Sequence, residues 1–296
     1  MKKILIGFLF ALLFIFPCKG TIQEYDLDVP YVPTPYEVVA EMLRMADIDK
    51  DDILYDLGSG DGRIVITAAK EMGCHGVGVE IDARRIKLSR ENAAKEKVAD
   101  RVKFLQQDMF KADISRATVV AIYLLQSVNL KLRPKLLREL KSGTRIVSHN
   151  YSMGEWKADK TSEVNIDWNK HTVYYWVVPE NVTGTWEWSI PTSSANDYYV
   201  LKLVQQFQEF AGTLFVNGTG ILIGLGEIIG DKLQFTVERN LKGQTVTMLF
   251  SGRISGNSIE GSIKSQAGSA INPIKWKAQR DPSTVTPIDS SQQDLN

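Results

Sequence analysis

Between Thr34 and Pro179 the chain alternates short β-rich apolar runs with stretches of helical periodicity. Helices are expected at 63–72, 83–97 and 130–140, because apolar residues recur there every three or four positions. This alternation predicts an α/β fold with a largely parallel sheet. Strands are expected at 53–57, 76–81, 102–105, 119–124, 145–148, 164–166 and 172–178. Only "DWNKH" separates the last two, which therefore suit an antiparallel hairpin.

An opening helix precedes the first strand. In "TPYE", Thr34 suits the N-cap, Pro35 the first helical position and Glu37 the capping box, and apolar residues then recur at helical spacing. The expected structural role of Thr34 is therefore that of a helix cap.

The pattern changes after Pro179, where helical periodicity disappears. About eight β-rich runs follow, joined by turn pairs such as Asn217-Gly218, and an antiparallel barrel or meander is the natural arrangement. The last segment is rich in Ser, Thr, Pro and Gln, which predicts disorder. The expected domains are an α/β unit at 21–180, a β-rich unit at 181–280 and a disordered tail at 281–296.

The first twenty residues have lysines followed by an unbroken apolar run from Ile4 to Phe16. This pattern predicts a signal peptide cleaved after Gly20, or an uncleaved signal anchor. Cys18 leaves lipidation as an alternative, although Phe16 and Pro17 stand where small residues are expected. Without this leader only Cys74 remains, so the mature chain cannot form an internal disulfide.

Charge narrows the choice of partner. Lys plus Arg equals Asp plus Glu at 35 each, which gives no support to nucleic acid as a partner. His75, His149 and His171 are scattered, and no Cys/His spacing predicts a metal site. Specificity must therefore come from the fold.

The motif "DLGSGDGR", residues 56–63, follows the first strand and opens the first helix after it. Gly58 and Gly60 match a dinucleotide-binding loop, but Arg63 stands where that loop needs its third glycine. No Gly-Lys-Ser/Thr follows, so a P-loop is also disfavoured. A glycine loop that presents carboxylates instead of a phosphate-binding lysine suits a cationic ligand.

The next two strands end in complementary groups. Glu80 ends the second, where a nucleotide-binding α/β fold places a carboxylate on ribose hydroxyls. Asp108 follows the third and could accept from an exocyclic amine, with Met109 or Phe110 beside a purine, although it could equally cap the next segment. Because ligands of such folds bind at the carboxyl ends of the strands, these groups are expected to line one crevice with the glycine loop.

Together, "DLGSGDGR", "VGVEID" and "QQDMF" resemble class I S-adenosylmethionine-dependent methyltransferases, over roughly Tyr31 to Val178. The resemblance implies a Rossmann-like seven-strand sheet and S-adenosyl-L-methionine as cofactor. It also implies which residues bind that cofactor: Asp56, Gly58, Gly60 and Gly62 hold methionine and ribose, Glu80 the ribose hydroxyls, and Asp108 with Met109 the adenine.

A narrower resemblance is carried by "YVPTPYEVVAEML", "YLLQSVNLKLRPKL" and "GTRIVSHNYSMGEW". These segments are similar to small protein-lysine methyltransferases, including archaeal enzymes of broad specificity and the mitochondrial enzyme that acts on the c-subunit of ATP synthase. The resemblance implies a protein lysine as acceptor and places Tyr31 and Thr34 over the cofactor. The β-rich unit and the leader depart from that family.

The acceptor is expected to approach after the fourth and fifth strands. Tyr123 ends the fourth, and Asn150, Tyr151 and Trp156 follow the fifth. Aromatic walls there could hold a lysine ammonium by cation–π contact, and a partly apolar channel would lower the lysine pKa. Tyr123, Asn150 and Tyr151 are therefore the candidate catalytic residues, with no general base assigned.

The leader conflicts with this function, because an exported domain does not meet a cofactor made in the cytoplasm. A membrane anchor that leaves the domain inside, an exported domain with another ligand and a later translation start all stay open. Membrane association is the favoured interpretation, with a membrane protein as acceptor. The alternatives are a small-molecule methyltransferase, or an exported non-enzymatic binding protein with a degenerate methyltransferase-like domain.

Overall fold

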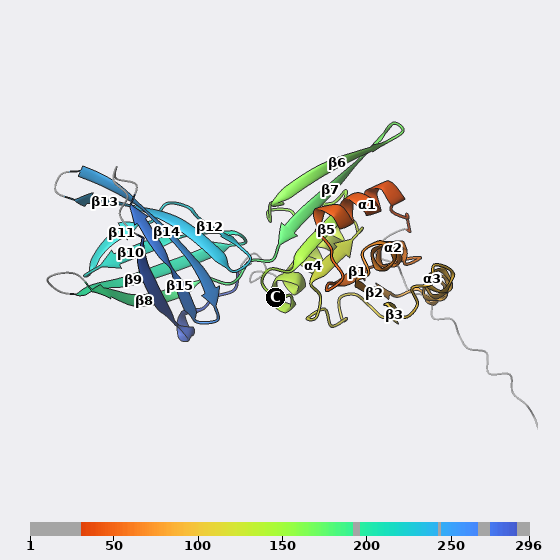
Figure 1. Cartoon of the computed structure of the whole chain (residues 1–296), viewed down its shortest axis with the longest axis horizontal. Helices are drawn as coiled ribbons and strands as arrows, with labels where there is room; N and C mark the ends of the chain where they lie inside the picture. Colours follow the sequence, from red (N-terminus) through yellow and green to blue (C-terminus); the bar gives the residue numbers. More distant parts are fainter. Residues whose placement is uncertain (1–30, 192–195, 242–243, 266–272, 289–296) are drawn as a thin grey trace, which may run out of the picture.

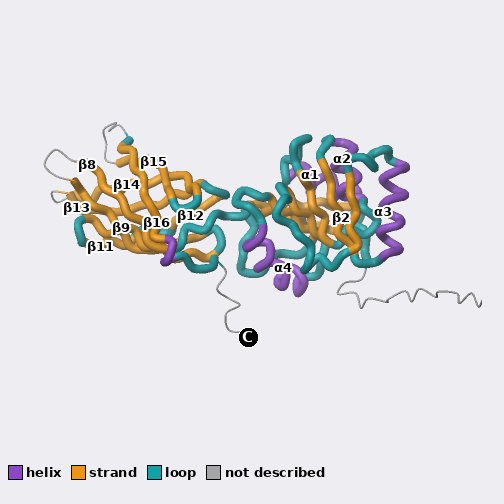
Figure 2. The backbone as a smooth tube through the Cα atoms, turned by 90° about the horizontal axis from the view of Figure 1, so that it is seen from below, coloured by secondary structure: helices purple, strands orange, loops and turns teal. Residues whose placement is uncertain are grey.

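The computed structural model describes residues 31–191, 196–241, 244–265 and 273–288. They form an α/β lobe with a seven-stranded sheet and an all-β lobe with a nine-stranded sheet (Figure 1). The lobes lie end to end, with the helices confined to the α/β lobe apart from one short 3-10 turn (Figure 2). The leader and residues 289–296 lie outside the described part of the chain. Within that part, no helix has the length and apolar character needed to cross a membrane.

The α/β lobe confirms the expected fold class. Its sheet has the order β3-β2-β1-β4-β5-β7-β6, with parallel pairing from β3 to β5 and antiparallel pairing at β7 and β6. The strands are β1 (Ile53–Leu57), β2 (His75–Glu80), β3 (Val102–Gln106), β4 (Val119–Ile122), β5 (Arg145–His149), β6 (Lys160–Ile166) and β7 (Asn169–Val177).

Helices cover both faces of this sheet. Side chains of α1 (Tyr36–Met45), α2 (Arg63–Glu71) and α3 (Ala83–Lys95) share one apolar core with the sheet. Those of α4 (Gln126–Glu139) share a separate core with the opposite face. The central strands β1, β4 and β5 are therefore buried from two sides, which explains why their sequences read as largely apolar runs.

The predicted helix cap at Thr34 is wrong. Helix α1 begins at Tyr36 with Pro35 at its N-cap, and no side chain caps it. The Thr34 hydroxyl instead lies 3.3 Å from Nδ1 of His149, at the end of β5. A tertiary contact with a residue distant in sequence takes the hydroxyl that a local cap would have used.

The second lobe is an antiparallel barrel, because β10 pairs with β9 as well as with β11 and β12 and thereby closes the sheet. It has nine strands where about eight are expected, since the apolar run 220–229 divides into β11 and β12. The strands are β8 (Gly184–Pro191), β9 (Asn196–Gln206), β10 (Glu209–Val216), β11 (Thr219–Leu222), β12 (Gly226–Ile229), β13 (Lys232–Leu241), β14 (Gln244–Ser255), β15 (Ser258–Ser265) and β16 (Ile274–Asp281).

The prediction of disorder from residue 281 onward is wrong for residues 281–288, which have a defined structure. Residues Pro282–Thr284 form the 3-10 turn η1, and Ile288 is buried. The carbonyl of Thr286 accepts hydrogen bonds from Asn181 Nδ2 (2.8 Å) and Thr183 Oγ1 (2.9 Å). The end of the barrel unit thus fastens onto the segment that joins the two lobes, and these bonds stabilise residues whose composition alone suggests a solvated tail.

Candidate active site

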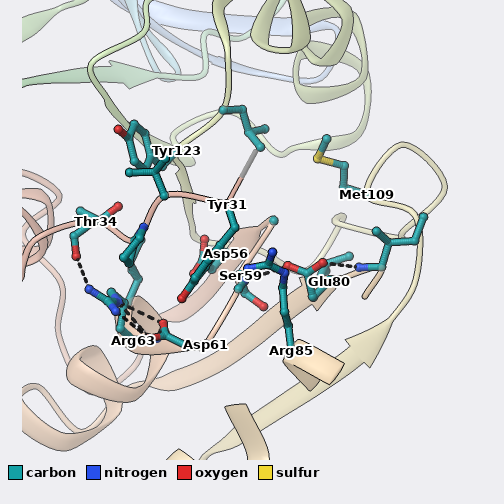
Figure 3. Close-up of a pocket in the computed structure, with 18 of the residues that line it drawn as sticks. Tyr31, Thr34, Asp56, Ser59, Asp61, Arg63, Glu80, Arg85, Met109 and Tyr123 are labelled. Atoms are coloured by element: carbon teal, nitrogen blue, oxygen red, sulfur yellow. Dashed lines mark hydrogen bonds and ion pairs between the residues drawn. The ribbon is translucent and has the colours of Figure 1, made fainter. Parts of the chain in front are cut away.

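A pocket lies at the carboxyl ends of β1, β2 and β3, where the crevice is expected, and extends to the end of β4 (Figure 3). Most of the residues proposed from the sequence to bind the cofactor line it, together with Tyr123 from the expected acceptor side. These lining residues are Tyr31, Thr34, Asp56, Gly58, Gly60, Glu80, Asp108, Met109 and Tyr123.

The glycines after β1 are required by the backbone. Gly58, Gly60 and Gly62 have φ angles of 86°, 54° and 80°, a region that other L-residues rarely adopt. Gly62 does not line the pocket. It is the N-cap of α2, and a Cβ there would lie 2.7 Å from the Phe104 ring. Gly62 therefore allows the helix to approach the sheet closely, a packing role distinct from the cofactor contact implied by the resemblance.

The Glu80 side chain joins two loops. Its Oε2 accepts a hydrogen bond from the Gly60 N–H, and its Oε1 accepts from the N–H groups of Ile81 and Asp82, all at 2.9 Å. The side chain is only 8% exposed. Glu80 thus fixes the glycine loop to the end of β2 and still borders the pocket.

Asp56 is a buried carboxyl group in acidic surroundings. Burial raises its pKa to about 8, and the nearby carboxylates of Glu80 and Asp61 add to this effect. No cation is among the groups that determine this shift. Asp56 is therefore largely protonated at neutral pH, and a cationic ligand in the pocket would stabilise its ionised form.

The segment before α1 crosses the glycine loop as a strap, defined here as residues 31–34. The Tyr31 ring packs on Gly60 so closely that a Cβ there would lie 2.5 Å from it. The Arg85 guanidinium lies 3.7 Å from the centroid of the same ring. Arg63 donates from Nη1 to the Thr34 carbonyl (2.8 Å) and pairs with Asp61 (Figure 3). The strap is thus held by residues of the loop and helix that it covers.

Asp108 caps a local turn at the edge of the pocket. Its Oδ1 accepts a hydrogen bond from the N–H of Phe110 (2.9 Å), which is a local turn cap. Asp108 and Met109 also line the pocket. The cap fixes the carboxylate at the pocket edge, so the structural role and the proposed binding role are compatible.

Of the three proposed acceptor residues, Tyr123 lines the pocket, and Tyr151 lies beside Tyr123. The ring centroids of Tyr123 and Tyr151 are 6.3 Å apart, with nearly parallel planes. Burial raises the pKa of Tyr123, and Tyr151 adds to the effect, while a hydrogen bond with Asn150 opposes it. Asn150 has a φ of 62° and accepts from the Thr172 N–H through Oδ1 (2.9 Å). Asn150 and Tyr151 are thus neighbours of a residue that lines the pocket and do not line it themselves.

The proposed role of Trp156 in holding the acceptor is wrong. Its side chain is fully buried, and its ring packs against Trp176 and Phe207. Phe207 comes from the turn between β9 and β10 of the barrel. Trp156 is therefore not an accessible loop aromatic, because Trp176 of its own lobe and Phe207 of the other lobe both pack on its ring.

A histidine pair that was not predicted from the sequence lies beside Tyr123. Nε2 of His149 lies 2.9 Å from Nδ1 of His171, and the ring centroids of His149 and Tyr123 are 3.9 Å apart. Burial, together with His171, lowers the pKa of His149 to about 4, so this ring is neutral at pH 7. The sequence alone does not bring the two residues together; pairing of β5 with β7 does, because it places His149 opposite Val173, two residues from His171. Among the described residues no group of three or more His, Cys, Asp or Glu side chains could hold a metal ion.

The pocket fits S-adenosyl-L-methionine by the chemistry of its walls. Asp56 is a buried acid whose charged neighbours are also acids, and it suits a ligand with cationic groups. The Oγ of Ser59 is buried at the pocket and lacks a hydrogen-bond partner among the described residues. Glu80 and Asp108 supply carboxylates that suit hydroxyl and amine donors.

Comparison with known proteins identifies the family. A protein-lysine N-methyltransferase from Saccharolobus islandicus (strain REY15A) is 47% identical over 160 residues, which cover 54% of this chain and 99% of that protein. The chain belongs to the protein-lysine N-methyltransferase family. Residues 56–160 of this methyltransferase also match the family described as the ANTKMT methyltransferase domain.

Two further similarities concern the same region of the methyltransferase. A lysine N-methyltransferase from Xenopus laevis, named for the c-subunit of ATP synthase, is 34% identical over 48% of this chain and 62% of that protein. The crystal structure of an RNA methyltransferase from Salinibacter ruber with S-adenosyl-L-homocysteine is 54% identical, covering 51% of this chain and 96% of that one, with a TM-score of 0.48. The archaeal relative matches over nearly its whole length, so close to half of this methyltransferase has no counterpart in it.

The expected activity class and cofactor are thereby confirmed. The chain is an S-adenosylmethionine-dependent methyltransferase, and its pocket occupies the position that the glycine loop, Glu80 and Asp108 indicate from the sequence.

Proposed function

We propose that this methyltransferase transfers the methyl group to the ε-amine of a lysine in a protein substrate. The observation that carries the proposal is the end of the pocket at Tyr123, whose ring is flanked by His149 and Tyr151. Since the low pKa of His149 keeps it uncharged, these rings form an aromatic wall without positive charge. Such a wall suits a lysine side chain by cation–π contact.

The proposed roles of the residues follow from the chemistry. When bound, S-adenosyl-L-methionine supplies a methyl group on a sulfonium. The acceptor amine must be neutral and aligned with that methyl, so orientation and desolvation provide most of the rate. Tyr123 and Tyr151 border the acceptor and exclude water from it. Asn150 lowers the pKa of Tyr123 and is itself fixed by the Thr172 N–H, which donates to its Oδ1. A partly apolar channel lowers the pKa of the incoming lysine and favours its neutral form.

We further propose that the methyltransferase works beside a membrane, with a membrane protein as acceptor. The apolar run from Ile4 to Phe16 supports membrane association. Relatives include enzymes named for lysine methylation of the ATP synthase c-subunit and of the adenine nucleotide translocase. We also propose that the boundary between the methyltransferase domain and the barrel domain lies near residue 180, since the α/β sheet ends at Val177 and the barrel begins at Gly184.

Transfer to lysine is tested with the purified chain, methyl-labelled S-adenosyl-L-methionine and a cell-envelope extract. One portion of the extract is acetylated beforehand to block its lysine amines, and another is treated with ribonuclease. Label should enter protein in the untreated and ribonuclease-treated portions and be lost from the acetylated one. Mass spectrometry should place the methyl on lysine. Label that survives acetylation would overturn the lysine assignment.

Location is tested separately. Full-length protein carrying one tag at the C-terminus and another directly after residue 20 should fractionate with membranes, with both tags protected from protease added outside intact cells. Release of a soluble, exported chain would contradict the anchor proposal and leave the lysine test unaffected.

A further inference from the structure

The turn between β9 and β10 carries a barrel residue that packs in the other lobe. Phe207 has a φ of 55° and is 3% exposed. It belongs to the apolar core between α4 and the α/β sheet, whereas Leu203 and Phe210 on either side belong to the barrel core. A residue in the left-handed region other than glycine is a backbone cost that persists only where surrounding contacts compensate it. The contacts of the buried Phe207 ring must therefore compensate the cost of its backbone conformation.

The Phe207 ring lies between Trp156 and Arg133. Its centroid is 5.9 Å from that of Trp156, with the two planes 11° apart. The Arg133 guanidinium is 5.0 Å from the Phe207 centroid. Burial of an aromatic ring against another ring and a cation gives directional packing beyond the area that it removes from water. Phe207 is therefore an anchor between the lobes.

Polar contacts fix the turn around this anchor. Gln208 donates from Nε2 to the Lys157 carbonyl (2.8 Å), directly beside Trp156. Gln205 donates from Nε2 to the carbonyls of Phe207 (2.7 Å) and Glu180 (3.0 Å). The turn thus has one defined placement against the α/β lobe.

The anchored segment leads to the acceptor residues. Arg133, which stacks on Phe207, also donates from Nη1 to the Met153 carbonyl (2.9 Å). One turn earlier in α4, Asn129 donates from Nδ2 to the Tyr151 carbonyl (3.0 Å). Residues 150–157, named here the acceptor segment, are therefore held by α4 at residues 151–153 and by the barrel at Trp156 and Lys157.

We propose that Phe207 is a positioning residue for methyl transfer, through which the barrel holds the acceptor segment and with it Asn150 and Tyr151. This inference rests on the proposed function, since it assigns the acceptor end to those residues. It also gives the barrel a role that the archaeal relative, which has no counterpart to it, does not require. The cofactor loop and Glu80 lie on other strands, so the effect is confined to the acceptor side.

The test compares the full chain with Phe207→Ala, Phe207→Leu and Val204→Ala. Val204 is on the same hairpin but 68% exposed, which makes it the matched control. Phe207→Ala should lower the apparent kcat/KM for the envelope extract at least fivefold, with the Kd for S-adenosyl-L-methionine within twofold of the parent. Phe207→Leu should restore part of the loss, and Val204→Ala should match the parent.

Hydrogen exchange of the ligand-free chain gives a readout that does not depend on activity. Phe207→Ala should exchange faster in residues 150–157 and at the parent rate in residues 56–82. If lysine transfer itself fails, this comparison alone decides the inference. Unchanged exchange in residues 150–157, or equal loss of cofactor and acceptor binding, would overturn it. If Phe207→Ala does not fold, Gln208→Ala, which removes the bond to Lys157, replaces it under the same criteria.

Discussion

The Glu80 carboxylate accepts a hydrogen bond from the backbone N–H of Gly60, which precedes it by 20 residues. Because two further N–H groups bind the other oxygen, the carboxylate sets the position of the glycine loop before any ligand arrives. Binding of the cofactor and the shape of its loop are therefore linked through one side chain.

Substitution of Glu80 tests this link. Glu80→Ala should weaken binding of S-adenosyl-L-methionine at least tenfold, because it removes an acceptor for ribose and releases Gly60; a tenfold loss corresponds to about 1.4 kcal/mol. Glu80→Gln, which keeps one carbonyl acceptor, should lose less. Titration calorimetry measures both, and equal affinity for Glu80→Ala and the parent would contradict the assignment.

The raised pKa of Asp56 predicts a pH dependence of cofactor binding. The free carboxyl titrates at about 8, and a bound cation should lower that pKa. Binding therefore releases a proton below pH 8, and affinity should fall by up to about tenfold per pH unit as the pH is lowered. Calorimetry in buffers of different ionisation enthalpy measures the released proton.

Asp56→Asn serves as the control. This variant should bind S-adenosyl-L-methionine weakly, and its affinity should lack the part of the pH dependence that Asp56 causes. The folded state holds a proton that the unfolded chain releases above pH 4, so Asp56 lowers stability progressively as the pH rises toward 8. Asp56→Asn should therefore have a higher Tm than the parent at pH 8 and a similar one at pH 4.

Gly60 should tolerate no side chain while Tyr31 is present. Gly60→Ala adds a Cβ 2.5 Å from the Tyr31 ring at a φ of 54°, where a side chain costs roughly 1–2 kcal/mol. Cofactor affinity should fall more than tenfold. In a Tyr31→Ala background the same substitution should cost less, since only the backbone strain remains. Additive effects in this double-mutant cycle would show that the strap and the loop are not in contact.

A buried ion pair at the amino ends of β1 and β5, the opposite end of the strands from the pocket, should affect stability alone. Asp52, 5% exposed, pairs with Arg145, which also donates to the carbonyls of Ala46 and Asp47 after α1 (2.7 Å each). Asp52→Ala leaves the Arg145 cation without its partner and should cost about 3 kcal/mol. Denaturant unfolding measures the loss, and the Kd for the cofactor, measured under native conditions, should not change.

The cofactor site could be predicted from the sequence where a residue's type is required by its backbone conformation or by its place at the end of a parallel strand. Gly58 and Gly60 could be read as a ligand loop because few other residues adopt their backbone, and Glu80 and Asp108 follow from the order of parallel strands. Loop residues with several uses were harder. Thr34 is a common cap residue, and only its contact with His149 decides against that use.

Contacts between the lobes could not be predicted at all. Trp156 follows a strand at the acceptor side, and no residue near it in the sequence indicates that Phe207, far along the chain, packs on it. Phe207 itself continues an apolar strand pattern and gives no sign that it leaves the barrel core. Such pairings depend on how two separate units meet, which no local periodicity encodes.

Asn181 and Thr183 donate hydrogen bonds to the carbonyl of Thr286, a residue that the ribosome adds about a hundred positions later. The α/β sheet is complete once the ribosome has added Val177, but the segment between the lobes bonds to Thr286, which is translated after β16, the last strand of the barrel. The α/β lobe can therefore fold while the barrel is still emerging, and the bonds of Thr286 are added to the contacts of Phe207 only after the last barrel strand has been made. A chain that ends before Thr286 would carry a finished cofactor pocket but lack the hydrogen bonds that Asn181 and Thr183 donate at the joint.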